Sequence, residues 1–348
     1  MLKNIIENCT KLENGWTRES FPGSATAVLE NLEFKGSLEA FEAEVGEWLE
    51  SAKLPKQLNL YNNFGEPSMT LFNNGKFAID LYFWRKNDTL IHSHGFRGAF
   101  KILYGVSLHE EFNVKTVEQF SRDLLKTKLS QKSIKIMKAG DVQLIGPEMA
   151  LTHRVVHLAD PTVTLCVRTV EDSELSQWHH LSSGLSFQKK HISEKTIKKN
   201  LYFQYLLQSD LKKAKSFYVK LLNELSTAEQ ISLYEGVCFD QIGLDPDVTE
   251  LLSEMIYERF QKENWFKLYA KHYESIQSNL QESYAESAEL KLVAHAINNK
   301  FSRKQLDELL GEFSKKSSFE LTKELKENTY VFTEGFEDRQ LDILNKFS

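Results

Sequence analysis

Cysteine is scarce in this chain, and long apolar runs are missing from it. Only 3 of the 348 residues are cysteines, and they stand far apart at Cys9, Cys166 and Cys238. Such a set cannot form a disulfide framework, and a chain of this length can bury a core without one. We therefore expect a protein of a reducing compartment, the cytoplasm. No apolar run approaches the roughly 20 residues of a bilayer-spanning helix, so we expect no membrane association.

An excess of basic charge is missing as well. Lys and Arg number 43 against 49 Asp and Glu, so the net charge is −6, and the two signs are interspersed. Nucleic-acid binding generally requires a basic face, so the composition argues against a nucleic-acid partner. The stretch Met1–Asn8 contains acid and lacks the apolar segment of a signal peptide, so we expect no targeting sequence there.

Glycine and proline are few and unevenly distributed. Eleven of the 16 glycines and five of the 6 prolines precede residue 162. This distribution predicts a turn-rich β-domain over residues 61–182, followed by helices over residues 190–348. Residues 1–60 are expected to form a helical segment that packs on the β-domain. Helix-start patterns at Ser37 and Ser302, each followed by apolar residues at helical spacing, support both helical regions.

The predicted β-domain consists of short aromatic and β-branched runs divided by Gly, Asn and Asp. The clearest strands are Phe77–Phe83, Phe100–Tyr104 and Val163–Val167. Between them, the segment Val117–Leu125 is expected to form a short helical excursion away from the barrel.

Three histidines form the most informative pattern in the chain. His92 and His94 are one residue apart, so on a strand both side chains project to the same face and can reach one metal ion. A third, His153, follows the glycine-punctuated segment Gly140–Pro147. Imidazole ligands suit Fe(II), and zinc, nickel and manganese are the alternatives. We predict that these three histidines hold a metal ion.

The spacing of these segments resembles the two motifs of the cupin superfamily. Over about residues 61–170 the chain also resembles the cysteine dioxygenase family of thiol dioxygenases. The resemblance rests on Gly75–Phe77, Leu81–Trp84, Ile91–His94, Phe100–Gly105, Leu151–Val155 and Pro161–Leu165. It implies a cupin barrel, a double-stranded β-helix or jelly roll, which here would carry an N-terminal helical layer and a C-terminal all-helical domain. It also implies a non-haem Fe(II) oxygenase that needs no organic cofactor and oxidises a small thiol or another small anionic metabolite with O₂.

The departures from the family are as specific as the matches. Most cupins place a carboxylate shortly after the second histidine, whereas this chain has Gly98–Ala99 there, as in three-histidine thiol dioxygenases. The arginine that clamps the substrate carboxylate in the family aligns with Pro67. The family's Ser-His-Tyr set aligns with Thr164, Cys166 and Arg168, so its catalytic tyrosine and histidine are absent.

Other side chains are candidates for substrate contacts. Strand parity places Arg168 on one face with Thr164 and Cys166, and the resemblance implies that this face points into the barrel, where a guanidinium needs an anionic partner. That partner is either an anionic group of the substrate or an acid at the barrel mouth. Arg97, just after the ligands, is a second candidate. Tyr82 shares a face with Trp84 and would either supply a phenol to the site or belong to the core.

Nearby residues have simpler interpretations. Cys166 lacks an activating partner and is expected to be inert packing. Arg154 follows a ligand on its strand, so it should point away and form a structural ion pair. His109 and His157 are expected to be exposed to solvent, with a role beside the metal ligands as the alternative.

The sequence is also compatible with two other classes of function. The same barrel could carry a different metal-dependent enzyme, such as an isomerase or lyase that uses Ni, Mn or Zn. Alternatively, a barrel without catalytic activity could sense a ligand while the helical region binds a partner protein. The helices of residues 190–348 could equally bury a homodimer interface.

Overall fold

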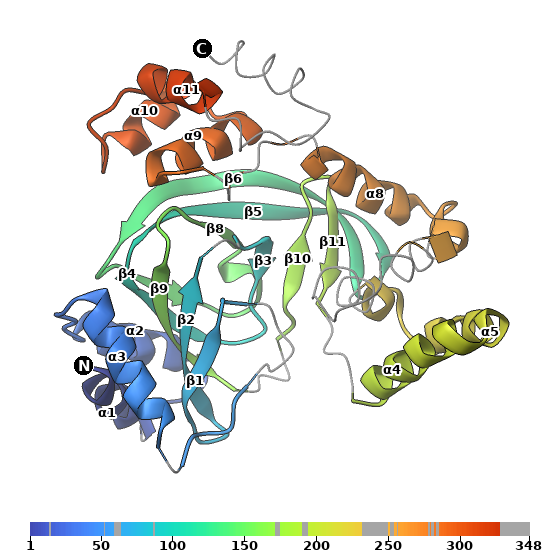
Figure 1. The fold of residues 1–348 in the computed structure, drawn as a ribbon, viewed down its shortest axis with the longest axis horizontal. Helices are drawn as coiled ribbons and strands as arrows, with labels where there is room; N and C mark the ends of the chain where they lie inside the picture. The colour runs from blue at the N-terminus through green and yellow to red at the C-terminus, as the bar shows by residue number, and fades with distance from the viewer. Residues whose placement is uncertain are drawn as a thin grey trace. The chain divides into compact units, whose positions relative to one another are not determined.

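The computed structural model describes residues 1–13, 15–51, 53–58, 64–85, 88–170, 175–189, 194–231, 250, 254–255, 257–277, 279, 282 and 285–327. Its contacts divide the chain into two units (Figure 1). The first unit comprises Met1–Asn113, Ser130–Leu175 and Tyr273–Ser348, and the second comprises Val114–Leu129 and Ser176–His272. The first unit thus joins segments that the sequence separates, because residues 285–327 pack on the strands near the middle of the chain.

One sheet of the first unit has the strand order β1-β2-β9-β4-β7, and each neighbouring pair is antiparallel. Its strands are β1 (Ser68–Asn73), β2 (Phe77–Trp84), β4 (Gly98–Tyr104), β7 (Val142–Ile145) and β9 (Thr162–Thr169). The three strands expected from the sequence are therefore confirmed as β2, β4 and β9. Their apolar, β-branched composition suits strands that are covered on both faces.

Three helices cover one face of this sheet (Figure 1). They are α1 (Leu2–Thr10), which leads into a 3₁₀ turn at Lys11–Glu13, α2 (Phe21–Glu30) and α3 (Leu38–Leu49). The predicted start at Ser37 is confirmed, since its hydroxyl accepts a hydrogen bond from the backbone N–H of Ala40 at 3.2 Å. Phe21 of α2 contacts Phe77 of β2, with ring centroids 5.9 Å apart, and both belong to one buried cluster with Ile79 and Leu81. Side chains of opposite parity on β2 consequently face the other way.

The second sheet of the first unit contains β3 (Ile91–Ser93), β8 (His153–His157) and parts of β5 (Val106–Ser121) and β6 (Leu124–Lys138). Strand β8 pairs antiparallel with both β3 and β5. A short 3₁₀ turn, Glu148–Ala150, leads from β7 towards β8.

Strands β5 and β6 form a long hairpin, and the helical excursion expected at Val117–Leu125 is wrong (Figure 1). Val117, Phe120 and Leu124 lie three and four residues apart, a spacing that imitates a helical stripe. The segment instead turns after Ser121, whose hydroxyl donates to the Asp123 carboxylate at 2.6 Å. Hydrogen bonding between the two long strands outweighs the local pattern.

Three further helices cover the outer side of the second sheet. They are α9 (Ala288–Asn298), α10 (Arg303–Leu310) and α11 (Ser318–Glu327). Leu292 and Val293 of α9 belong to one buried cluster with Leu108 of β5 and Val156 of β8. The capping box predicted at Ser302 is present. These helices bury their apolar stripe against the strands of their own chain.

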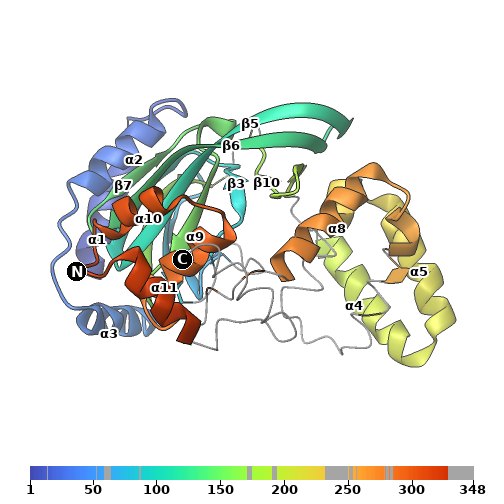
Figure 2. The ribbon, with the colours of Figure 1, turned by 90° about the horizontal axis from the view of Figure 1, so that it is seen from above.

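In the second unit, β11 (Leu185–Gln188) pairs antiparallel with β6 and with β10 (Trp178–His180). The helices α4 (Glu194–Ser209), α5 (Leu211–Glu224) and α8 (Asn264–Gln277) follow (Figure 2). Phe203 of α4 stacks on Tyr218 of α5 with ring centroids 4.4 Å apart. Among the described residues, no helix combines the length and apolar character needed to cross a bilayer.

Candidate metal centre

The inner faces of the two sheets of the first unit carry the polar and aromatic residues of the site. Asp80, Tyr82 and Trp84 alternate along β2 with the residues that face the N-terminal helices. On β9, Cys166 belongs to the same buried cluster as Tyr82 and Trp84, and Thr164 accepts a hydrogen bond from the Trp84 indole at 2.9 Å. This agrees with the strand parity predicted from the sequence.

His92, His94 and His153 meet between these faces. Each offers one ring nitrogen, and the three nitrogens lie within 4.8 Å of one another. Pairing of β3 with β8 places His92 directly opposite His153, which brings together residues that are about sixty positions apart. The Nε2 atoms of His94 and His153 are 3.3 Å apart. That spacing suits two nitrogens that bind the same metal ion, each at about 2.1 Å from it.

Hydrogen bonds indicate which ring nitrogens are available. Nδ1 of His92 lies 2.8 Å from the carbonyl oxygen of Leu90 and donates to it, so Nε2 keeps a lone pair. That Nε2 atom is buried and has no hydrogen-bond partner in the part of the chain that the structure describes. Nδ1 of His153 lies 2.6 Å from Nε2 of His109 on β5. A metal ion where the three Nε2 atoms converge would bind their lone pairs, and it would give His92 Nε2 the partner that it otherwise lacks.

Burial keeps these imidazoles neutral. Loss of hydration lowers the pKa of His92 to about 4, and only the contact with Leu90 opposes the shift. For His94 and His153, burial and then the neighbouring histidines lower the pKa well below its ordinary value. A neutral imidazole is the form that binds metal, so the lone pairs are available at neutral pH.

The group of nitrogen donors has no room for a carboxylate at the position where most cupins have one. A Cβ atom on Gly98 would lie 2.0 Å from the carbonyl oxygen of Val167 on the neighbouring strand β9. Real Cβ atoms do not approach backbone oxygen so closely, so the pairing of β4 with β9 requires glycine here. The close approach of the two backbones thus excludes an acidic side chain at position 98.

A cavity of about 50 Å³ adjoins the three histidines. This volume has room for roughly one or two water molecules. Among the described residues that line it, none carries a carboxylate, an ammonium or a guanidinium. The lining residues are Phe64, Tyr82, Trp84, Thr89, His92, His94, Phe96, Phe100, Ile145, His153, Val155, His157, Thr164 and Cys166.

Arg168 is buried, as predicted, and its partner is a carboxylate of the protein. Its Nε atom lies 2.6 Å from Oδ2 of Asp80, in an ion pair with both side chains buried. The guanidinium carbon lies 5.1 Å from the centre of the Phe96 ring. Arg168 does not line the cavity, and its contacts with Asp80 and Phe96 support an internal ion pair rather than a substrate clamp. Neither the substrate nor an acid at the barrel mouth is needed to balance its charge.

Tyr82 does line the cavity, and its hydroxyl donates to Asp80 Oδ2 at 3.4 Å. Burial, and then the Asp80 carboxylate, raise the pKa of this phenol well above its usual value, so it keeps its proton. Thr70 donates a second hydrogen bond to Asp80 at 2.7 Å. Arg97 is also absent from the lining, and its backbone N–H donates to Thr169 at 3.1 Å.

Two histidines expected at the surface are buried instead. His109 is fully buried and His157 is 3 % exposed, so the solvent-exposed interpretation of both is wrong. The sequence held a signal for His157, because it has the same parity as His153 on one strand. Asp80 was also missed, although a single carboxylate within an apolar run indicates a buried ion pair.

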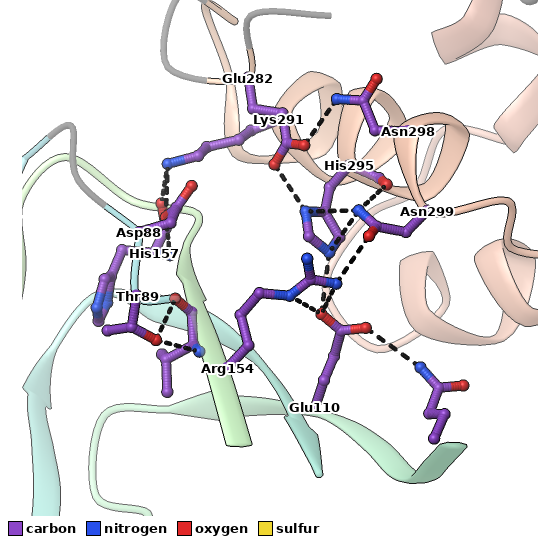
Figure 3. Close-up of polar contacts among 12 residues, drawn as sticks. Asp88, Thr89, Glu110, Arg154, His157, Glu282, Lys291, His295, Asn298 and Asn299 are labelled. Carbon is purple, nitrogen blue, oxygen red and sulfur yellow. Dashed lines mark hydrogen bonds and ion pairs between the residues drawn. The ribbon is translucent and has the colours of Figure 1, made fainter. Parts of the chain in front are cut away.

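The simpler expectations agree with the structure. Cys166 is buried beside the cavity, and burial raises the pKa of its thiol to about 12, so the thiol stays protonated. Arg154 points away from the histidines and forms an ion pair with Glu110 at 2.6 Å. Glu110 also accepts from His295 of α9 at 3.0 Å, and the other ring nitrogen of His295 lies 2.7 Å from Glu282 (Figure 3).

Comparisons with known proteins give no family for the chain. No protein family model and no curated protein matches it. Similar solved structures include an uncharacterized conserved protein with a double-stranded β-helix domain from Klebsiella pneumoniae (11 % identity, TM-score 0.24, 37 % of this chain and 89 % of that one). A DMSP lyase from Ruegeria pomeroyi has 12 % identity and a TM-score of 0.26 over 51 % of this chain and 94 % of that one. An oxalate oxidase has 13 % identity and a TM-score of 0.24 over 50 % and 81 %. TM-scores this low support no conclusion about this chain, so the evidence for its fold and site is the strand pairing and the side-chain contacts.

Proposed function

We propose that this chain is a metal-dependent enzyme of the cupin type, and specifically an Fe(II) oxygenase that oxidises a small thiol. The observation that supports this most directly is the convergence of His92, His94 and His153, three buried neutral imidazoles with no carboxylate among them. Three neutral ligands leave the full +2 charge of an ion uncompensated, which favours a negatively charged ligand such as a thiolate.

Bound Fe(II) would supply positions where O₂ and a thiolate meet. The residues of the chain supply the surroundings. Phe64, Phe96 and Phe100 form an apolar part of the cavity wall. Tyr82 presents a protonated phenol on the same wall, held by Asp80, whose charge is balanced by Arg168.

The cavity wall narrows the class of substrate. A buried carboxylate or ammonium on the substrate would need a partner of opposite charge, and the described lining residues provide none. The thiolate itself would be balanced by the metal. A small thiol with an uncharged remainder therefore suits the cavity better than an amino acid thiol, which is consistent with the replacement of the family's clamp by Pro67.

Oxygen consumption tests this proposal. We expect the Fe(II)-loaded protein to consume O₂ with small uncharged thiols and to do so far less with cysteine. His153→Ala should abolish the activity and release the metal, and Lys35→Ala on the exposed N-terminal segment serves as a neutral control. Iron in the protein as purified would support the proposal. A protein that binds iron but consumes no O₂ with any thiol would contradict it.

One observation favours a second candidate. A cavity of about 50 Å³ is much smaller than the roughly 300–1,000 Å³ of most ligand pockets. A metal site of this size also suits a protein that senses a small ligand without turnover. Ligand-dependent changes in thermal unfolding without O₂ consumption would favour this alternative.

A further inference from the structure

His157 occupies an unusual position in the cavity wall. It is the last residue of β8 and lies four positions after His153, so the two side chains project to the same face. Its ring stacks on Trp84, with centroids 4.3 Å apart and planes 14° apart. The same ring lines the cavity beside the metal-binding histidines.

One nitrogen of His157 has a partner and the other has none. Nδ1 lies 3.1 Å from the hydroxyl of Ser107, the residue opposite it on β5. Nε2 is buried and makes no hydrogen bond within the described part of the chain. A buried polar atom without a partner is unfavourable, so such an atom points to a place where a ligand or water can bind.

Other polar side chains of the wall are already engaged. Thr164 accepts from the Trp84 indole, and Thr89 accepts from the backbone N–H of Val155 at 2.8 Å. The Tyr82 hydroxyl donates to Asp80. Apart from atoms of the three predicted metal ligands, His157 Nε2 is the buried side-chain nitrogen or oxygen of the described lining that makes no hydrogen bond.

The C-terminal helices hold the backbone of His157 from the outer side of the sheet. Lys291 of α9 donates to the carbonyl oxygen of His157 at 2.7 Å and to Oδ1 of Asp88 at 3.1 Å (Figure 3). The same Asp88 oxygen accepts from the backbone N–H of His157 at 2.8 Å. Both backbone polar groups are thereby fixed, and Asp88 lies just before the strand that carries His92. This arrangement fixes the direction of the ring.

We propose that His157 is a substrate-contacting residue whose Nε2–H donates a hydrogen bond to a small ligand bound at the three-histidine site. The inference rests on the proposed function, because it requires a metal at that site. Ser107 can donate its hydroxyl proton to Nδ1, which places the imidazole proton on Nε2. Burial, and then Lys291, lower the pKa of His157 well below its ordinary value, so the ring carries a single N–H.

The ligand class follows from this chemistry. It has one atom that binds metal and an electronegative atom that accepts from Nε2, and the rest of it is small and uncharged. O₂ and linear anions such as azide have both atoms, and in a thiolate the sulfur itself can bind the metal and accept the hydrogen bond. Azide is therefore a suitable probe, since it is small enough for the cavity and accepts hydrogen bonds.

The experiment measures azide binding to the Co(II)-loaded full-length protein through its visible absorption spectrum. His157→Phe retains a ring against Trp84 and removes both nitrogens. We expect it to weaken azide binding about three- to tenfold, the effect of one lost hydrogen bond, with Co(II) affinity changed less than twofold. His157→Gln keeps an N–H donor and should restore azide affinity to within about twofold of the wild type.

A matched control lies in the second unit, where His272 is buried and its Nδ1 contacts the Ser182 hydroxyl at 3.0 Å. His272→Phe should leave azide binding unchanged. Ser107→Ala tests the assigned tautomer without altering His157, and it should weaken azide binding as well. Ser107→Ala keeps the inference testable if His157→Phe does not fold.

The outcomes separate the inference from the proposed function. If wild-type protein fails to bind Co(II), the proposed function fails and this inference falls with it. If Co(II) and azide bind normally to the wild type and azide binds equally well to His157→Phe and Ser107→Ala, the role of His157 is wrong and the metal site stands.

Discussion

Nδ1 of His153 lies 2.6 Å from Nε2 of His109, and both side chains are buried. A histidine that binds metal through Nε2 carries its proton on Nδ1, so His153 would donate this hydrogen bond and His109 would accept it. Such a partner fixes the orientation of the ligand ring. His109 thus supports the metal centre from β5 without belonging to it.

Replacing His109 should weaken metal binding. Contacts of this kind typically contribute 10- to 100-fold to metal affinity, so we expect His109→Phe to raise the Kd for Co(II) by about that factor. His109→Gln keeps an accepting oxygen and should lose less. Competition with a chromophoric chelator measures both constants. Equal Kd values for the wild type and a folded His109→Phe variant would show that the contact does not support the site.

The close approach of Gly98 to β9 predicts a strong effect of a single methyl group. In Gly98→Ala the new Cβ would lie 2.0 Å from the Val167 oxygen, so two buried strands must separate. We expect a loss of about 3 kcal/mol in the free energy of unfolding. Gly46→Ala is the control, because its Cβ meets nothing within 4 Å and the residue lies within α3.

Alanine in a helix is favoured over glycine by up to about 1 kcal/mol, so the control should be neutral or stabilising. Urea unfolding monitored by tryptophan fluorescence compares the two variants. Similar stability losses for both would contradict the argument from the backbone contact, and with it the explanation for the missing carboxylate.

The ion pair between Asp80 and Arg168 predicts non-additive mutations. Asp80→Leu leaves an unpaired buried guanidinium, and Arg168→Met leaves an unpaired buried carboxylate, each at a loss of about 3–5 kcal/mol. The double variant removes both charges and should lose less than the sum of the two. A double-mutant cycle from unfolding curves measures the coupling. Additive losses would mean that the two side chains act independently, which would reopen the substrate-clamp interpretation of Arg168.

The buried histidine of α9 predicts a stability contribution that depends on pH. Burial alone would lower the pKa of His295, but Glu282 and Glu110 outweigh it and, against the opposing charge of Arg154, raise the pKa to about 9. The pKa of His295 is higher in the folded protein than the value near 6.5 that it has in the unfolded chain. Charged His295 therefore stabilises the fold by about 3 kcal/mol below pH 6.5, and this contribution is lost as the pH rises through 9.

The difference in unfolding free energy between the wild type and His295→Gln should therefore be largest near pH 6 and shrink towards pH 10. His272→Gln is a matched control, because burial lowers the pKa of His272 to about 4. Its effect should not change between pH 7 and 10. An effect of His295→Gln that stays constant over this range would contradict the assignment of the charged histidine.

Much of the candidate site could be predicted from local patterns. The single residue between His92 and His94 fixes a common face on any strand, and the strands β2, β4 and β9 have compositions that few other structures accept. Strand parity also placed Tyr82 and Arg168 on the inner face. The apolar spacing at Val117–Leu125 led to the wrong prediction of a helix, because spacing alone does not show whether a segment pairs with a neighbouring strand.

The sequence by itself determined that three imidazoles would share a strand-rich region. It also determined that Gly98–Ala99, shortly after His94, would offer no carboxylate. Only the tertiary structure decided what surrounds them. Asp80 neutralises Arg168 because β2 and β9 are neighbours, and α9 fixes the backbone of His157 because distant helices cover β8. The physical reason is that the partners of buried polar groups come from segments far away in the chain. The local periodicity of the sequence does not indicate which distant segments come into contact.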